Sequence, residues 1–130
     1  MLADGHALMR RNLRVLLEGE DSVEVVAEAG DLSAAMRYVQ GYLPHVLVID
    51  LSMSNGSSLA AVRGLRDRVP GTEIVVLTME ESTVFAQQAL DAGAIGFVLK
   101  HTADAELAQG VRSAARGTKY VSPRISARLA

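Results

Sequence analysis

The sequence lacks several features that would assign it to whole classes of function. It contains no cysteine, which excludes disulfide frameworks and thiolate metal sites. No apolar run approaches the length needed to cross a membrane, and the charges at the amino terminus are in the wrong order for a signal peptide. The formal net charge is −2, so this segment has no basic excess for binding nucleic acid. We therefore expect a cytoplasmic protein without membrane association.

The common signatures of catalysis are absent as well. No glycine-rich phosphate loop of either common type is present, which counts against a nucleotide-binding protein. The serines that follow Asp50 have no histidine placed to activate them, so a hydrolase triad has little support. His6, His45 and His101 do not have the spacing of metal ligands, and we expect His6 at the rim of the acidic crevice or at the start of the first helix. We expect no zinc site and no enzyme.

What the sequence does contain is an alternation of strand-like and helix-like segments along a chain of single-domain length. Only three residues precede Asp4, so the first strand is expected to be short, and both ends of the chain look cut. Alternation with crossovers of this length predicts a parallel sheet of five strands with five helices on its two faces. The further strands are expected at residues 24–28, 46–50, 73–78 and 95–100, and the helices at residues 6–18, 32–43, 59–69, 82–91 and from 103 onward.

The most informative segment is the run from Val46 to Asp50. Four branched apolar residues deliver one carboxylate to the end of what is predicted to be a buried central strand. In open parallel sheets, ligands bind in the crevice beyond the carboxyl ends of the strands. Taken alone, Asp50 could merely cap the following helix. Other predicted strands end comparably, in Asp4, Thr78 and Lys100, so four polar side chains are expected to converge on one crevice.

This set of side chains suits the transfer of a phosphoryl group to an aspartate. A carboxylate can act as the nucleophile that accepts the group. A cation and a hydroxyl can hold the transferring oxygens, and a divalent metal can neutralise the developing charge. The sequence therefore favours phosphoryl acceptance at one edge of the sheet.

The same segments carry a resemblance that covers essentially the whole chain. Residues 2–6 (LADGH), 48–53 (VIDLSM), 76–79 (VLTM) and 92–100 (AGAIGFVLK) resemble the receiver domain of two-component response regulators. Together with residues 116–117 and 120–123, they look most like the NarL/FixJ subfamily, whose members usually continue into a LuxR-type helix-turn-helix domain. The resemblance implies a flavodoxin-like, doubly wound (βα)5 fold with sheet order 2-1-3-4-5.

The resemblance also implies a role for individual residues. Asp50 would accept a phosphoryl group from a sensor histidine kinase, Lys100 would pair with that group and Thr78 would move to hydrogen-bond it. Phe97 would then change rotamer and alter the neighbouring helical face. Mg²⁺ would bind between Asp4, Asp50 and the backbone carbonyl of Ser52.

The implied organisation is a receiver domain over residues 1–117. Residues 118–130 would begin a linker to a C-terminal effector domain outside this chain, and DNA would be bound only through that domain. The resemblance implies a homodimer as well. The sequence does not choose a dimerisation face.

One departure from the family pattern concerns the metal. The family has two adjacent acids where this chain has Asp4 followed by Gly5, and the missing acid is the one that usually touches the metal directly. Because Mg²⁺ tolerates water in place of a side chain, we predict binding weakened by about tenfold or more, which is ~1.4 kcal/mol.

Two rival interpretations stay open at this point. The first is an atypical pseudo-receiver, which acts as a dimerisation or interaction module without phosphorylation, and Gly5 favours it. The presence of Asp50, Thr78 and Lys100 favours a working receiver instead. A flavodoxin-like domain that binds a small molecule is the third interpretation. Such a domain would hold a ligand at the strand ends without metal dependence.

Overall fold

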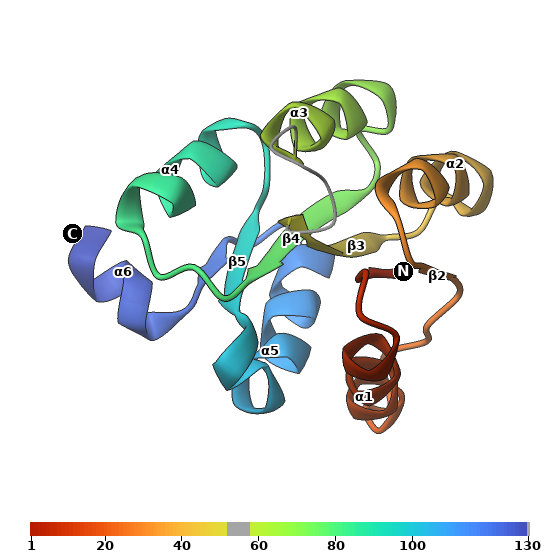
Figure 1. Cartoon of the computed structure of the whole chain (residues 1–130), viewed down its shortest axis with the longest axis horizontal. Coiled ribbons are helices and arrows are strands. Elements are labelled where there is room, and N and C mark those ends of the chain that lie inside the picture. The colour runs from red at the N-terminus through yellow and green to blue at the C-terminus, as the bar shows by residue number, and fades with distance from the viewer. Residues whose placement is uncertain (52–57, 130) are drawn as a thin grey trace.

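The computed structural model describes residues 1–51 and 58–129, which form a parallel sheet between two layers of helices (Figure 1). The strands are β1 (Leu2–Ala3), β2 (Glu28–Ala29), β3 (Val46–Asp50), β4 (Glu73–Thr78), β5 (Gly96–Leu99) and β6 (Tyr120–Val121). The helices are α1 (Ala7–Glu18), α2 (Leu32–Tyr42), α3 (Ser58–Arg68), α4 (Thr83–Asp91), α5 (Ala103–Ala115) and α6 (Pro123–Leu129), with a 3₁₀ turn, η2, over Lys100–Thr102. Among the described residues, no helix combines the length and apolar character that a membrane crossing requires.

The sheet has the predicted order, with one strand added. Its order is β2-β1-β3-β4-β5-β6, and every neighbouring pair is parallel. The predicted order 2-1-3-4-5 and the short first strand are confirmed. The sixth strand extends the sheet because Tyr120 and Val121 pair with Gly96 and Phe97 of β5. The predicted domain boundary at residue 117 stays a prediction.

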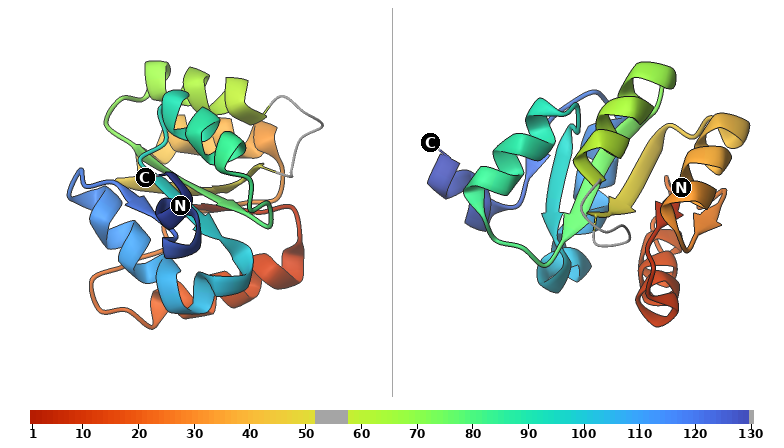
Figure 2. Two further views of the ribbon diagram at one scale, coloured as in Figure 1. Left: turned by 90° about the vertical axis from the view of Figure 1, so that its left-hand side faces the viewer. Right: turned by 45° about the horizontal axis from the view of Figure 1, so that its top comes forward.

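Each face of the sheet has its own apolar core. Helices α2, α3, α4 and α6 cover one face, where they contribute to a cluster with Leu47, Ile49 and Val76. Helices α1 and α5 cover the other face and pack on a second cluster with Val48, Val75 and Val98. The two layers are visible on opposite sides of the sheet in Figure 2. Since β3 contributes side chains to both clusters, its uninterrupted apolar run is explained.

The predicted strand over residues 24–28 is mostly wrong. Only Glu28 and Ala29 form β2, paired with Leu2 and Ala3 of β1. Residues 23–27 have no regular secondary structure and precede this paired stretch.

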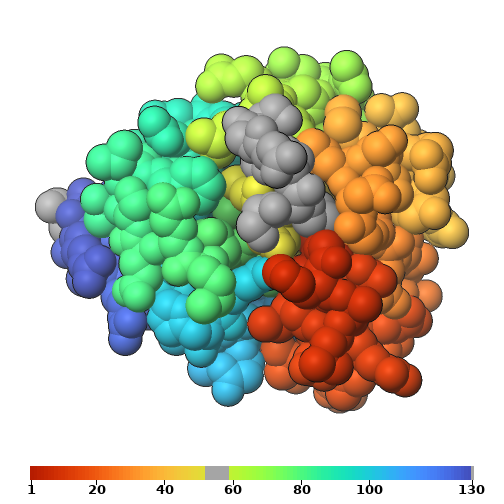
Figure 3. Space-filling model, in the orientation of Figure 1, coloured from red at the N-terminus to blue at the C-terminus, as the bar shows by residue number. Residues whose placement is uncertain are grey.

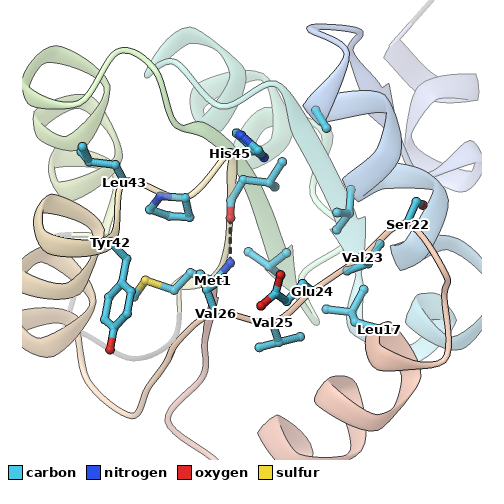
Figure 4. A pocket seen from close by; sticks show the side chains of 15 residues that line it. Met1, Leu17, Ser22, Val23, Glu24, Val25, Val26, Tyr42, Leu43 and His45 are labelled. Carbon is cyan, nitrogen blue, oxygen red and sulfur yellow. Dashed lines mark hydrogen bonds between the residues drawn. The ribbon is translucent and has the colours of Figure 1, made fainter.

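The unpaired segment leaves a cavity of about 430 Å³ at the amino ends of β1 and β3. Figure 4 shows Met1 between the segment Val23–Val26 and His45, with its ammonium group donating to the Val46 carbonyl at 2.9 Å. This cavity lies at the opposite edge of the sheet from Asp4 and Asp50, so it is not the predicted crevice.

Several helix ends are fixed by local contacts or backbone conformation. The Asp31 carboxylate accepts from the Ala34 N–H at 2.8 Å and caps α2. Gly93 follows α4 with a φ of +118°, a backbone conformation that glycine favours. Thr102 does not cap α5, because its hydroxyl donates back to the Leu99 carbonyl. For α3, the serines at positions 57 and 58 suggest an N-cap from the sequence, but they lie outside the described side chains.

Candidate functional site

The carboxyl ends of four strands bring the four predicted side chains to one edge of the sheet. Asp4 follows β1, Asp50 and Thr78 end β3 and β4, and Lys100 follows β5. All four residues are buried. In Figure 3 the segments that follow β1, β4 and β5, coloured red, green and cyan, meet around the centre of the face shown. The predicted convergence of Asp4, Asp50 and Lys100 is also seen in direct contacts.

Lys100 bridges the two carboxylates. Its Nζ donates to Asp50 Oδ2 at 2.9 Å and lies 3.1 Å from Asp4 Oδ2. Burial opposes protonation of this ammonium, but its hydrogen bond to Asp50 and the attraction of both carboxylates outweigh the effect of burial, so the pKa of Lys100 is raised. Lys100 therefore stays charged between two acids.

The two oxygens of the Asp4 carboxylate face different groups. Oδ1 accepts from the backbone N–H of His6 at 2.8 Å, which fixes the turn after β1. Oδ2 is buried and, despite the ion pair with Lys100, accepts no hydrogen bond with good geometry from the described residues. Such a buried acceptor carries a desolvation cost that a cation could offset.

A neighbouring arginine holds the same turn in place. Arg10 of α1 donates from Nη1 to the Asp4 carbonyl at 2.7 Å and pairs through Nε with Glu28 at 3.3 Å. An arginine in an amphipathic helix is expected to face solvent, and the sequence alone does not indicate this contact. The contact depends on how α1 packs beside β2, which no local pattern reveals.

The two predicted switch residues occupy different surroundings. The Thr78 hydroxyl accepts from the backbone N–H of Glu80 at 3.1 Å at the start of the β4–α4 loop. The Phe97 ring is fully buried in the core and meets the ring of Phe85 edge-to-face, with centroids 6.1 Å apart. Phe97 thus links β5 directly to α4.

His6 belongs to the site, which the sequence analysis did not foresee beyond placing it at the rim. One ligand atom each from Asp4, His6 and Asp50 lies within 4.8 Å of the others. His6 Nδ1 is 3.8 Å from Asp4 Oδ1, and its side chain is 76% exposed. The expectation that there is no zinc site stays a prediction. The Asp-x-His spacing at a strand end was the signal available in the sequence.

The residues present fit a divalent cation. Asp4 and Asp50 offer two buried carboxylates, and the Asp4 Oδ2 atom accepts no hydrogen bond from the described residues; carboxylate oxygens are the donors that such ions use. The third predicted ligand, the backbone carbonyl of Ser52, lies outside the described residues. Gly5 offers no side-chain ligand.

The fold and the site together define the receiver class of signalling modules, and the comparisons agree. Residues 1–112 match the family model described as the response regulator receiver domain. The chain belongs to this family. The oxygen regulatory protein NreC of Staphylococcus carnosus (strain TM300) is 35% identical over 130 residues, which cover 99% of this chain and 60% of that protein.

Two solved structures show the same likeness. A LuxR-family response regulator from Aurantimonas sp. SI85-9A1 superposes with a TM-score of 0.92 at 34% identity, over 98% of this chain and 91% of that one. The isolated receiver domain of RcsB from Salmonella enterica serovar Typhimurium, in its apo form, gives 0.89 at 30% identity, over 98% and 95%. These relatives support the NarL/FixJ subfamily. The chain spans about 60% of the length of the NreC protein it matches.

Proposed function

We propose that this chain is a working receiver in which Asp50 accepts a phosphoryl group from a phosphohistidine of a sensor kinase. The observation that carries the proposal is the contact of Asp50 with Lys100 at 2.9 Å, beside Asp4, at the carboxyl ends of neighbouring strands. An ammonium fixed beside a carboxylate can stabilise the negative charge that a transferred phosphoryl group brings.

The proposed step forms one bond and breaks one. A carboxylate oxygen of Asp50 attacks the phosphorus while the bond between phosphorus and the donor imidazole nitrogen breaks. The electron pair leaves with the imidazole, which takes up a proton from solvent. Lys100 then pairs with the phosphoryl oxygens. A carboxylate nucleophile has no proton to release in this step.

Asp4 and Asp50 would hold the divalent cation, together with the Ser52 carbonyl that the family resemblance implies. Bound there, Mg²⁺ supplies neutralisation of charge on the phosphoryl oxygens. The Thr78 hydroxyl would exchange its present bond from the Glu80 N–H for one to the phosphoryl group. That exchange moves the β4–α4 loop, and the packing of Phe97 on Phe85 of α4 gives the change a path to the helical surface.

The proposed organisation places the receiver at residues 1–117 and the start of a linker at residues 118–130. The NreC relatives are longer than this chain, and one RcsB structure is of a complex with DNA. By analogy, the phosphorylated receiver would control a C-terminal DNA-binding domain and act as a homodimer. This part of the proposal concerns the whole protein.

The test is the intact mass of the chain after incubation with acetyl phosphate, with and without Mg²⁺. We expect a gain of one phosphoryl group that depends on Mg²⁺ and is lost in Asp50→Asn. Thr78→Ala is the matched control, because it should still accept the group while losing the conformational response.

An unchanged mass at every Mg²⁺ concentration, with a folded protein and a phosphorylated reference receiver in the same tube, would overturn the proposal. The pseudo-receiver, an interaction module that needs no phosphorylation, would then be the better account. Gly5 is the feature of this chain that favours it.

A further inference from the structure

The candidate cation site of this chain combines carboxylate donors with an imidazole. Two donors are buried carboxylates, Asp4 and Asp50, and the third side chain within reach is an imidazole, His6. We propose that His6 supplies the ligand that Gly5 cannot, and that the site therefore prefers a borderline divalent transition-metal ion over Mg²⁺. The inference rests on the proposed function in assuming that the crevice of Asp50 binds a divalent cation.

The position of His6 supports this role. It stands between β1 and α1, and its backbone N–H donates to Asp4 Oδ1 at 2.8 Å, so the residue is tied to the carboxylate it would share an ion with. Its side chain makes no capping bond to α1. Its Nδ1 lies 3.8 Å from Asp4 Oδ1. The imidazole is thus held near the acids without another structural task among the described contacts.

The spacing of the three donors fits one ion. Zinc-like ions bind nitrogen and oxygen at about 2.0–2.2 Å, so two ligands on opposite sides of one ion lie roughly 4.0–4.4 Å apart. The atoms of Asp4, His6 and Asp50 lie within 4.8 Å of one another. Small side-chain movements would bring them onto a common centre. The exposed imidazole, 76% accessible, is free to make such a movement.

The buried carboxylate supplies an independent reason to expect an ion. Asp4 is fully buried, and its Oδ2 accepts no hydrogen bond from the part of the chain that the structure describes. Its one charged neighbour among the described residues is the Lys100 ammonium, 3.1 Å away, which it shares with Asp50. Two carboxylates thus share one ammonium, and a divalent cation bound beside them would add the positive charge that this pair lacks.

Charge and ligand chemistry decide which cation. Asp4, Asp50 and Lys100 carry formal charges that sum to −1, and His6 adds a donor without adding negative charge. Mg²⁺ is a hard ion that prefers oxygen donors and binds largely through charge. Imidazole suits zinc, copper, iron and nickel, and affinities for nitrogen-containing sites rise from manganese through cobalt to nickel and copper. With Gly5 in place of an acid and His6 as a ligand, the site therefore loses more affinity for Mg²⁺ than for these ions.

The test measures affinities for Co²⁺ and Mg²⁺ by titration calorimetry at one fixed pH, with the visible absorption of Co²⁺ as a second readout. For the unchanged chain we expect Co²⁺ to bind at least about tenfold more tightly than Mg²⁺, a difference of ~1.4 kcal/mol. His6→Ala should lower the Co²⁺ affinity about tenfold and leave the Mg²⁺ affinity nearly unchanged. The Co²⁺ absorption should also change in that variant, because a nitrogen ligand is lost.

Two further variants make the test specific. His45 is exposed and lines the cavity at the far edge of the sheet, so His45→Ala controls for adventitious binding to histidine and should leave both affinities unchanged. Gly5→Asp restores an acid beside Asp4 and should raise the Mg²⁺ affinity by about tenfold or more. Both substitutions change surface residues, which limits their effect on folding.

Equal Co²⁺ affinity in the unchanged chain and in His6→Ala would overturn the inference, as would a preference of the unchanged chain for Mg²⁺. Phosphorylation of Asp50 from acetyl phosphate is scored separately. A chain that is phosphorylated in Mg²⁺ but shows no effect of His6→Ala keeps the proposed function and loses this inference. A chain that binds Co²⁺ through His6 but is never phosphorylated keeps this inference and loses the proposed function.

Discussion

At the scale of single residues, the site is held by one buried cation between two buried anions. Lys100 contacts Asp50 at 2.9 Å and Asp4 at 3.1 Å, and all three residues are buried. A buried ionic group is costly to assemble, and removing one partner leaves an uncompensated charge. The three residues must therefore be understood as one unit.

The first prediction compares removal of the cation with removal of one anion. Lys100→Met should lower the free energy of unfolding by about 3–5 kcal/mol, because two buried carboxylates lose their common partner. Asp50→Asn should cost less, because Lys100 keeps its ion pair with Asp4. Urea denaturation of the two variants and the unchanged chain checks the order. A greater loss for Asp50→Asn would contradict the central place of Lys100.

A second prediction uses two glycines with opposite surroundings. A Cβ at Gly96 of β5 would stand 2.9 Å from a methyl carbon of Val75, so Gly96→Ala should destabilise by about 1–3 kcal/mol through overpacking. A Cβ at Gly64 of α3 would meet nothing within 4 Å, so Gly64→Ala should stabilise by about 0.5–1 kcal/mol through helix propensity. Thermal unfolding of both variants measures whether each substitution raises or lowers the stability. The same sign for both would show that these two environments are wrongly described.

At the scale of elements, residues 118–129, proposed above as the start of a linker, pack against β5 and the core. The strand β6 pairs with β5, and Ile125 of α6 is fully buried in the core cluster that contains Phe97. Arg124 reaches Glu81, in the loop after Thr78, at 3.1 Å. The segment predicted as the start of a linker therefore lies directly beside the predicted switch elements.

The third prediction tests that packing. Ile125→Ala removes a fully buried side chain and should destabilise by about 2–5 kcal/mol. Ser126→Ala, one residue on and exposed in the same helix, is the matched control and should change stability by less than about 0.5 kcal/mol. Chemical denaturation measures the free energy of unfolding of both variants and of the unchanged chain. Indistinguishable midpoints for the two variants would mean that α6 does not contribute to the core.

At the scale of the whole molecule, the sequence predicted what depends on local pattern and missed what depends on distant partners. The apolar run ending in Asp50 predicted a central strand because consecutive apolar residues face both sides of a sheet, and all five residues of β3 are buried. The segment 24–28 has the composition of a strand, but only its last residue, Glu28, pairs with β1, and the register of that pairing is not contained in the composition. The Asp4–His6–Asp50 group required the register of β1 on β3, which spacing along the chain does not give. The contacts of Ile125 were hidden for the same reason.

The fourth prediction concerns pH and the whole fold. Burial lowers the pKa of the Met1 amino group from 8.0 to about 6. Between about pH 6 and pH 8 the unfolded chain binds more protons at this group than the folded chain, so stability should rise with pH across this window. The full effect is roughly 2–3 kcal/mol, lost again as the pH falls from about 8 to about 6. Denaturation midpoints of the 130-residue chain across this range measure it.

The control for this effect is the same chain acetylated at the Met1 amino group, which cannot titrate there. Its stability should show a smaller change between pH 6 and pH 8 than that of the unmodified chain. Parallel curves for the two forms would contradict the assignment of the pH dependence to Met1.

The measurement that tests the central claim most directly locates the phosphoryl group. After incubation with acetyl phosphate and a divalent cation, reduction with borohydride converts an aspartyl phosphate to homoserine, and peptide mass spectrometry identifies its position. The account predicts homoserine at position 50, absent without the phosphodonor and absent in Asp50→Asn. Homoserine at position 4 instead, or at no position in a folded chain, would contradict it.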